Sequence, residues 1–182
     1  MEVLFATSNT NKVEEANKIA AEYGMSFQQV NIIYPEVRAE SVSKVAGEGV
    51  RYVYEKLKRP VIVEDSGLFI DALNDFPGTY SAYVFKRIGC EGILKLLDGV
   101  EDRRARFKSA IGYCDKKGVK VYEGVVEGSI PCEMRGSKGF GYDPIFKPLD
   151  SEKTFAEDPA HKNRASHRRK ATELLCQALS PR

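Results

Sequence analysis

Short apolar runs and helical repeats alternate over the first third of the chain. Residues 3–6 are apolar strand formers and residues 7–11 are all Thr, Ser or Asn, which predicts a strand followed by a loop that caps a helix. Apolar positions then recur at helical spacing as far as Gly24, which is placed to end that helix. The chain is therefore expected to begin with a strand and a helix joined by a short polar loop.

The same alternation continues to residue 63. We expect a strand over residues 27–33, then a helix that opens at Ser41 and ends at Pro60, and then a strand over residues 61–63. The order strand, helix, strand, helix, strand is typical of an α/β layer arrangement.

The rest of the chain shows a less regular pattern. A helix is expected around residues 92–97, and residues 105–114 and 119–127 predict two strands joined by a hairpin turn. Residues 131–148 contain three prolines and three glycines, which predicts a long loop around a short strand. Residues 166–179 repeat apolar positions at helical spacing and predict a last helix.

Composition narrows the class of protein. The 182 residues correspond to one domain, or to two lobes that share a core, and 42% hydrophobic with 30% charged residues is a globular composition. The net charge of +2 argues against a surface built throughout for nucleic acid. Four cysteines without a CxxC pair, two histidines and no long apolar run predict a cytoplasmic protein with free thiols and no structural zinc.

A polar segment, residues 7–12 (TSNTNK), lies between a predicted strand and a predicted helix. Ligands of open α/β sheets bind beyond the carboxyl ends of the strands, and a helix N-terminus offers free N–H groups and partial positive charge that suit phosphate. Lys12 adds a full positive charge. The alternative is an ordinary capped helix with a surface lysine, and the glycines of a Walker A loop are absent.

Two adjacent carboxylates, Glu64 and Asp65, follow the apolar run 61–63. Such a pair is unfavourable beside a buried strand unless a positive group accompanies it, and Mg²⁺, which takes one or two carboxylates, suits that place. Neighbours in a strand point to opposite faces, so only one of the two is expected to be a direct ligand. Glu36 or Glu40 is placed to complete a metal site, and a solvated turn is the alternative.

Two later segments carry groups that suit a nucleobase. Phe140 or Tyr142 offers a stacking face and Asp143 offers an acceptor for a ring N–H, unless this glycine-rich loop only packs aromatic rings into the core. Residues 161–170 hold both histidines and five basic residues. Within them Arg168 can donate to a purine O6, with a solvated basic turn or a nucleic-acid patch as the alternative.

Together these motifs describe a nucleoside triphosphate site, and they resemble one family over nearly the whole chain. That family is the inosine triphosphate pyrophosphatases, also called Ham1-like proteins. The matching motifs are TSNTNK (7–12), VEDSGL (63–68), FPG (76–78), GFGYDPIF (139–146) and SHR (166–168).

The resemblance implies an α/β fold, elongated and two-lobed, with a mixed sheet flanked by helices and the active site in the cleft between the lobes. It implies a single Ham1-like domain over residues 1–182, with no linker between the lobes. It also implies a homodimer that uses Mg²⁺ to hydrolyse ITP, dITP and XTP to the monophosphate and pyrophosphate. Neither a membrane nor a stable nucleic-acid partner is expected.

The resemblance also assigns roles to residues. Asp65 would bind the metal and accept a proton from the attacking water, and Lys12 would offset charge on the leaving pyrophosphate. Glu36 would be the second metal ligand, and Glu40 is the alternative. The residues implied to contact substrate are Thr7, Ser8, Asn9, Thr10, Asn11, Lys12, Lys44, Ser66, Phe140, Gly141, Tyr142, Asp143, Lys162, His167 and Arg168.

Base selectivity follows from the same assignment, and three other functions stay open. The 6-oxo group and N1–H of hypoxanthine and xanthine suit Arg168 and Asp143, whereas adenine would leave the arginine donor unpaired. A Maf-like pyrophosphatase acting on other nucleotides is one alternative. A nucleic-acid-binding protein using residues 161–170 and a nucleotide sensor without turnover are the others.

Overall fold

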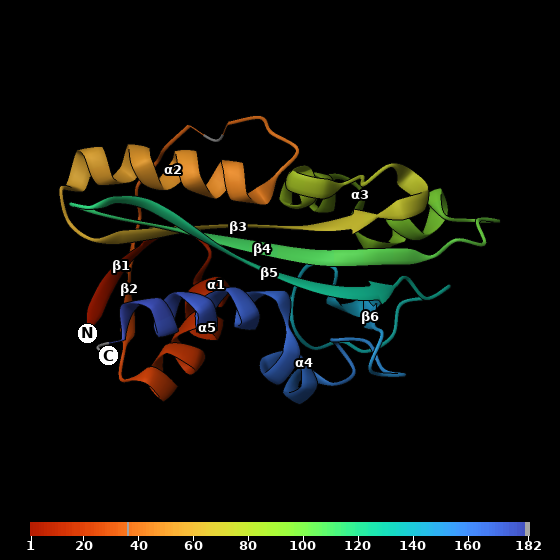
Figure 1. The fold of residues 1–182 in the computed structure, drawn as a ribbon. Coiled ribbons are helices and arrows are strands. Elements are labelled where there is room, and N and C mark those ends of the chain that lie inside the picture. Colours follow the sequence, from red (N-terminus) through yellow and green to blue (C-terminus); the bar gives the residue numbers. More distant parts are fainter. Residues whose placement is uncertain (36, 181–182) are drawn as a thin grey trace. The chain divides into compact units, whose positions relative to one another are not determined.

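A computed structural model of the chain describes residues 1–35 and 37–180 (Figure 1). Its first five strands and α-helices follow the order strand, helix, strand, helix, strand that the pattern predicts. In chain order the strands and α-helices are β1 (Glu2–Ala6), α1 (Thr10–Ala20), β2 (Ser26–Val30), α2 (Val42–Leu57), β3 (Val61–Ile70), α3 (Ser81–Leu96), β4 (Arg104–Asp115), β5 (Gly118–Ser129), β6 (Lys147–Pro148), α4 (Pro159–Ala165) and α5 (His167–Leu179).

The described strands form one six-stranded sheet in the order β2-β1-β3-β4-β5-β6. Strand β1 runs parallel to both of its neighbours, with Leu4 opposite Val61 in β3, and β6 is antiparallel to β5. Parallel strands need crossover connections, which α1 and α2 supply, whereas two residues join β4 to β5. The expected α/β class with a mixed sheet and flanking helices is therefore confirmed.

Capping residues explain where the early helices begin and end. The Asn9 side chain accepts a hydrogen bond from Asn11 N at the start of α1, and the Ser41 side chain accepts one from Lys44 N at the start of α2. Gly24, with φ of 66°, adopts the left-handed conformation that ends the turn after α1. These are the boundaries that the sequence predicts.

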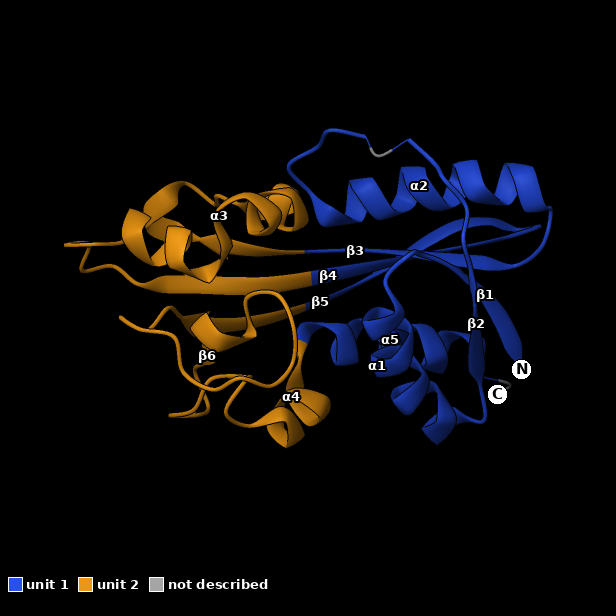
Figure 2. Cartoon of the chain, turned by 180° about the vertical axis from the view of Figure 1, so that it is seen from behind, with its two compact units in different colours: residues 1–66, 109–124, 167–182 blue, residues 67–108, 125–166 orange. Residues whose placement is uncertain are grey.

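The chain divides into two compact units, which are described separately (Figure 2). Unit 1 holds residues 1–66, 109–124 and 167–182, and unit 2 holds residues 67–108 and 125–166. The expectation of a single domain with an active-site cleft between two lobes stays a prediction.

In unit 1 the sheet is covered on both faces (Figure 1). One face packs Phe5 and Ile62 against α1 and α5, and the other packs Leu4 and Val63 against α2. Both faces of this parallel part are therefore dry, and burying its large side chains contributes roughly 1.5–3 kcal/mol each.

In unit 2 the core gathers around three phenylalanine rings. Phe107, on β4, lies against Phe146, with ring centroids 4.5 Å apart, and Phe155 stacks on the Phe107 ring. Ile93 in α3 and Leu97, directly after the end of that helix, are fully buried in the same cluster. Tyr142 and Ile145 also belong to this core, which therefore anchors the segment after β5 that carries the glycine-rich loop.

Three predicted element boundaries were wrong. Strand β3 does not end at Val63 but continues to Ile70, so that Glu64 and Asp65 lie inside a strand and not in a turn. Strand β2 ends at Val30 rather than Ile33. Helix α3 begins at Ser81, well before the predicted start, because a kink at Gly89 (φ 62°) interrupts its periodicity.

Helix α4 was not predicted, although its start carries a recognisable signal. The Asp158 side chain caps it by accepting from His161 N, and Pro159 occupies its first turn. The predicted basic segment 161–170 is therefore divided between two helices. No helix within the described part of the chain is both long and apolar enough to cross a bilayer.

Candidate active site

Strand β3 places the two adjacent carboxylates on opposite faces of the sheet. Val63 belongs to the cluster under α2, whereas Ile62 belongs to the cluster under α1 and α5. Because side chains alternate along a strand, Asp65 follows Val63 toward the α2 face, and Glu64 and Ser66 follow Ile62. The sequence predicted this division, and the structure shows which face each residue takes.

Glu64 is the centre of a buried ionic network in unit 1. The residue is only 5% exposed. Its Oε2 lies 2.6 Å from Lys12 Nζ, and its Oε1 lies 3.2 Å from an Arg168 guanidinium nitrogen. The Ser109 hydroxyl also donates to Oε1, at 2.6 Å. Glu64 therefore has two cations and a hydroxyl as partners.

The two cations decide the charge state of Glu64. Burial by itself would raise the pKa of this carboxyl, but Arg168 and Lys12 act in the opposite direction and hold its pKa well below the ordinary value of 4.5. Glu64 is therefore ionised at neutral pH. Its negative charge in turn compensates two buried positive groups.

Arg168 lies at the start of α5 and is 2% exposed. It donates to Glu15 in α1, to Glu64 and, at 3.2 Å, to Ser66 Oγ. His167 beside it is also buried. The carboxylates explain why cations are tolerated at this helix N-terminus, where the helix dipole disfavours them.

The segment between β1 and α1 is built by short local hydrogen bonds. Thr7 Oγ1 accepts from Asn9 N at 3.1 Å, and the Asn9 side chain caps α1. Ser8, Thr10 and Asn11 are exposed. Polar side chains and helix N–H groups therefore stand at the surface next to the ammonium of Lys12, which suits an anion.

The expected metal ligands are only partly within the described residues. Glu36 lies outside them, and Glu40 is exposed in the loop before α2. Lys44 is exposed in the first turn of α2. The described residues contain no cluster of three or more His, Cys, Asp or Glu that could hold a metal ion.

Within unit 2, a second buried ion pair organises the glycine-rich loop. Asp143 Oδ2 lies 2.7 Å from Lys162 Nζ and accepts from Phe140 N at 2.9 Å. Both charged residues are less than 5% exposed, and the ammonium lies 4.3 Å from the centre of the Phe140 ring. A side chain at Gly139 would overlap the Asp143 carboxylate, so the loop requires glycine there.

The other residues of this loop differ in accessibility. Tyr142 is buried, donates to Ser81 O at 3.2 Å and packs its ring edge-on against Phe85. Gly141 and the half-buried Phe140 line a cavity of about 280 Å³ in unit 2. Of the two aromatic residues in this loop, Phe140 is therefore the one that a ligand can reach, whereas the buried Tyr142 anchors the loop to Ser81.

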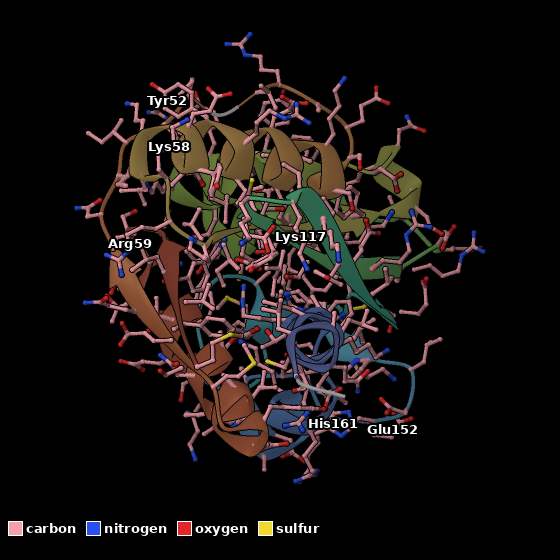
Figure 3. The ribbon with its side chains drawn as sticks, turned by 60° about the vertical axis from the view of Figure 1, so that its left-hand side comes forward. Tyr52, Lys58, Arg59, Lys117, Glu152 and His161 are labelled. Atoms are coloured by element: carbon pink, nitrogen blue, oxygen red, sulfur yellow. The ribbon has the colours of Figure 1, made fainter. Side chains whose placement is uncertain are left out.

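The basic segment 161–170 is largely engaged in internal ion pairs. Lys162 pairs with Asp143, and Arg169 pairs with Glu22 and Glu173. His161, labelled in Figure 3, has a partly exposed side chain. Its Nε2 lies 3.1 Å from Asp150 Oδ1. These pairs occupy much of the charge that a nucleic-acid surface would need.

Two features of the site could not be predicted from the sequence. The sequence predicts a positive group beside the pair of Glu64 and Asp65 but does not show that Lys12 and Arg168 are the partners of Glu64. Ser109 carried no signal, because a single serine in a strand pattern is common. Only the sheet brings it to Glu64.

The fold and this site define an α/β protein with an open mixed sheet, a polar helix N-terminus and a buried acid held between a lysine and an arginine. The chain belongs to the Ham1 family, whose sequence model matches residues 3–178. The family resemblance of the motifs is thus confirmed.

Relatives match over nearly their full length. The chain is 54% identical over 179 residues to the dITP/XTP pyrophosphatase of Methanopyrus kandleri, covering 97% of this chain and 95% of that protein. It is 50% identical to the dITP/XTP pyrophosphatase of Pyrococcus horikoshii, covering 98% and 97%. Among solved structures, the Ham1 protein of Staphylococcus aureus superimposes with a TM-score of 0.85 at 30% identity, covering 98% of both chains. A HAM1 protein from Coxiella burnetii gives 0.86 at 31%, with the same coverage.

Proposed function

We propose that this protein hydrolyses ITP, dITP and XTP to the nucleoside monophosphate and pyrophosphate, and so removes deaminated purines from the nucleotide pool. The observation that carries the proposal is the 54% identity to a dITP/XTP pyrophosphatase over 97% of the chain. The polar N-terminus of α1, with Lys12 beside it, supports the phosphate part of the assignment.

Residues 7–12 are the proposed phosphate site. Their exposed hydroxyls and amides and the first N–H groups of α1 can donate to phosphate oxygens. Lys12 is placed to offset negative charge on the departing pyrophosphate, a charge that grows in the transition state. Lys44, exposed on α2, is a further proposed phosphate contact.

We propose Mg²⁺ as the cofactor, with Asp65 as one ligand and Glu36 as the other, or Glu40 in its place. The buried oxygens of Glu64 already face two cations, which leaves Asp65 as the member of the pair suited to a metal. Magnesium takes one or two protein carboxylates and keeps water and phosphate as other ligands, so this donor set fits. When bound, it would neutralise phosphate charge and lower the pKa of a coordinated water.

Asp65 is also the proposed proton acceptor for the attacking water. An aspartate with an ordinary pKa of about 3.9 is a weak base, so activation of the water by the metal would carry much of the rate, with Asp65 orienting the water and accepting its proton. Ser66, one position further along β3, is a proposed substrate contact.

For the base, the assignments implied by the resemblance stay predictions. Phe140 is proposed to stack on the purine, and its half-exposed ring supports that role. Asp143 and Arg168 are the proposed readers of N1–H and the 6-oxo group. The remaining proposed contacts are Gly141, Tyr142, Lys162 and His167. A homodimer and a cytoplasmic location are proposed from the same resemblance.

An activity panel tests the function. Purified protein with Mg²⁺ is given ITP, dITP, XTP, GTP, ATP, dTTP and UTP, and pyrophosphate and orthophosphate are measured separately. We expect pyrophosphate release with ITP, dITP and XTP well above that with ATP. A preference for dTTP or UTP would favour the Maf-like alternative, and binding of ITP without pyrophosphate would favour the sensor.

Substitution of Asp65 tests its assigned role. Asp65→Asn keeps the size of the side chain but removes the charge that would bind metal and accept a proton. We expect the variant to fold and to lose nearly all turnover, by roughly 10²–10⁴-fold, as the loss of a positioned general base does. Asp98→Asn is the matched control, because it makes the same change at an exposed aspartate of unit 2 that has no role in the proposed site. Retained turnover in Asp65→Asn would remove Asp65 from the mechanism.

A further inference from the structure

Glu64 links residues that the proposed function places on different parts of the substrate. Lys12 is the proposed phosphate cation, and Arg168 and Ser66 are proposed contacts elsewhere on the nucleotide. Glu64 pairs with Lys12 through Oε2 and with Arg168 through Oε1, and Arg168 in turn donates to Ser66 Oγ. One carboxylate therefore governs the placement of two cations. The inference drawn from it rests on the proposed function.

The surroundings of Glu64 exclude direct contact with the substrate or metal. Its side chain is fully buried, and each carboxylate oxygen has a protein partner within 3.2 Å. The neighbouring strand contributes the Ser109 hydroxyl, which fixes the orientation of the carboxylate. Glu64 must therefore act through other residues.

Lys12 is the residue that gains most from this arrangement. Its long side chain would otherwise sample many rotamers, but its Nζ lies 2.6 Å from the carboxylate and 3.3 Å from the backbone carbonyl of Glu64. An ammonium has three donors, and the Lys12 side chain keeps 18% exposure. A phosphate oxygen can therefore approach while Glu64 still holds the ammonium.

We propose that Glu64 is a positioning residue for pyrophosphate release: it fixes the Lys12 ammonium at the place where charge develops on the leaving group, while its other oxygen holds the Arg168 guanidinium beside Ser66. The interaction with developing charge strengthens in the transition state, so misplacing the ammonium lowers kcat more than it raises KM. A merely structural role would not couple the effect of Glu64 to Lys12.

A double-mutant cycle tests the proposal with dITP and Mg²⁺. The variants are Glu64→Gln, Lys12→Met and the double variant, and kcat and KM are measured for each with thermal unfolding as a check on folding. We expect Glu64→Gln to lower kcat at least about tenfold and to change KM less than about threefold. In the Lys12→Met background, Glu64→Gln should lower kcat by less than about threefold, because residues that act together are not additive.

A matched control distinguishes the effect of the Lys12 ion pair from the effect of the Arg168 ion pairs. Glu15 also pairs with Arg168, but through Nη1 rather than the Nη2 that meets Glu64, and the carboxylate 2.6 Å from Lys12 Nζ is that of Glu64. The effect of Glu15→Gln on kcat should therefore be the same with and without Lys12→Met. Equal losses for Glu64→Gln in both backgrounds, or an unchanged kcat in that single variant, would overturn the proposal.

A milder substitution keeps the test decisive if Glu64→Gln does not fold. Ser109→Ala removes the hydroxyl that orients the carboxylate and leaves all three charges in place. We expect a fall in kcat of about threefold or more that disappears in the Lys12→Met background. An additive or absent effect contradicts the positioning role. If the wild-type protein releases no pyrophosphate from dITP, the proposed function itself has failed, which is a separate outcome.

Discussion

Two buried acids, Glu64 and Asp143, each lie within hydrogen-bond distance of a cation. Glu64 has Lys12 and Arg168 in unit 1, and Asp143 has Lys162 in unit 2. Removing one partner of such a pair strands the other charge away from water, which typically costs more than the pair itself contributes. Both sites should therefore tolerate substitution poorly.

The pair in unit 2 gives the first test at the scale of a residue. Lys162→Met should lower the free energy of unfolding by about 3–5 kcal/mol, because Asp143 stays buried without its cation. Urea denaturation measures the change. Lys147→Met, which removes a pair with the exposed Glu152, is the control and should cost less than about 1 kcal/mol. Similar losses for both variants would contradict this account of the loop.

The thiols offer a second residue-scale prediction. Burial raises the pKa of Cys90 to about 12 and of Cys176 to about 11, and it also raises that of the buried Cys114. Only Cys132 is exposed. Because the thiolate is the reactive form, an aromatic disulfide reagent at pH 8 should modify one thiol per chain quickly and three only after denaturation. Rapid reaction of a second thiol in the native protein would show that one of these sites opens readily.

Close packing between elements explains several glycines. Helix α2 approaches β4 so closely that a Cβ on Gly112 would lie 2.5 Å from Ala46 O and 2.8 Å from Val50 Cγ1. A Cβ on Gly47, within α2 itself, would meet its nearest neighbour at 3.4 Å, which is ordinary contact. The same substitution should therefore have opposite effects at these two positions.

This contrast is the prediction at the scale of the element. Gly112→Ala should lower the free energy of unfolding by at least about 1–3 kcal/mol, because the helix must move away from the strand. Gly47→Ala should raise it by about 0.5–1 kcal/mol, because alanine favours the helix. Chemical denaturation of both variants beside the wild type measures the difference. A neutral Gly112→Ala would mean that α2 shifts easily on the sheet.

At the scale of the whole molecule, the ionic network makes stability depend on pH. The folded pKa of Glu64 lies below its ordinary value of 4.5, so the stability from its charge is fully present above that value. It is lost progressively as the pH falls below 4.5, because the carboxylate then takes up a proton in the unfolded chain more readily than in the fold. Acid should therefore weaken the fold through this site.

Comparison with Glu64→Gln measures this dependence. The wild type should be more stable than the variant at pH 7, and the difference in unfolding free energy should shrink between pH 4.5 and pH 3, since glutamine does not titrate. Urea denaturation at a series of pH values gives both curves. A difference that stays constant across this range would show that Glu64 keeps no abnormal pKa in the fold.

Much of the element order could be predicted from periodicity and capping. Asn9, Ser41 and Gly24 act locally through hydrogen bonds or backbone conformation, so the helix boundaries they set are visible in the sequence. The hairpin around Gly118 is likewise a local feature. Helix α4, which was not predicted, also carries local signals at its start, the capping residue Asp158 and Pro159 in its first turn.

The family was also determined by the sequence alone, because five short motifs that resemble those of the family occur in order along the chain. The length of β3 and the ionic partners of Glu64 were decided only by tertiary structure. In the sequence pattern, a charged residue such as Glu64 indicates the end of a buried strand unless its charged partners are known. Those partners, Lys12 and Arg168, lie 52 positions before it and 104 after it. Only the packing of α1 and α5 on one face of the sheet brings the three charges together, and no local pattern encodes that distance.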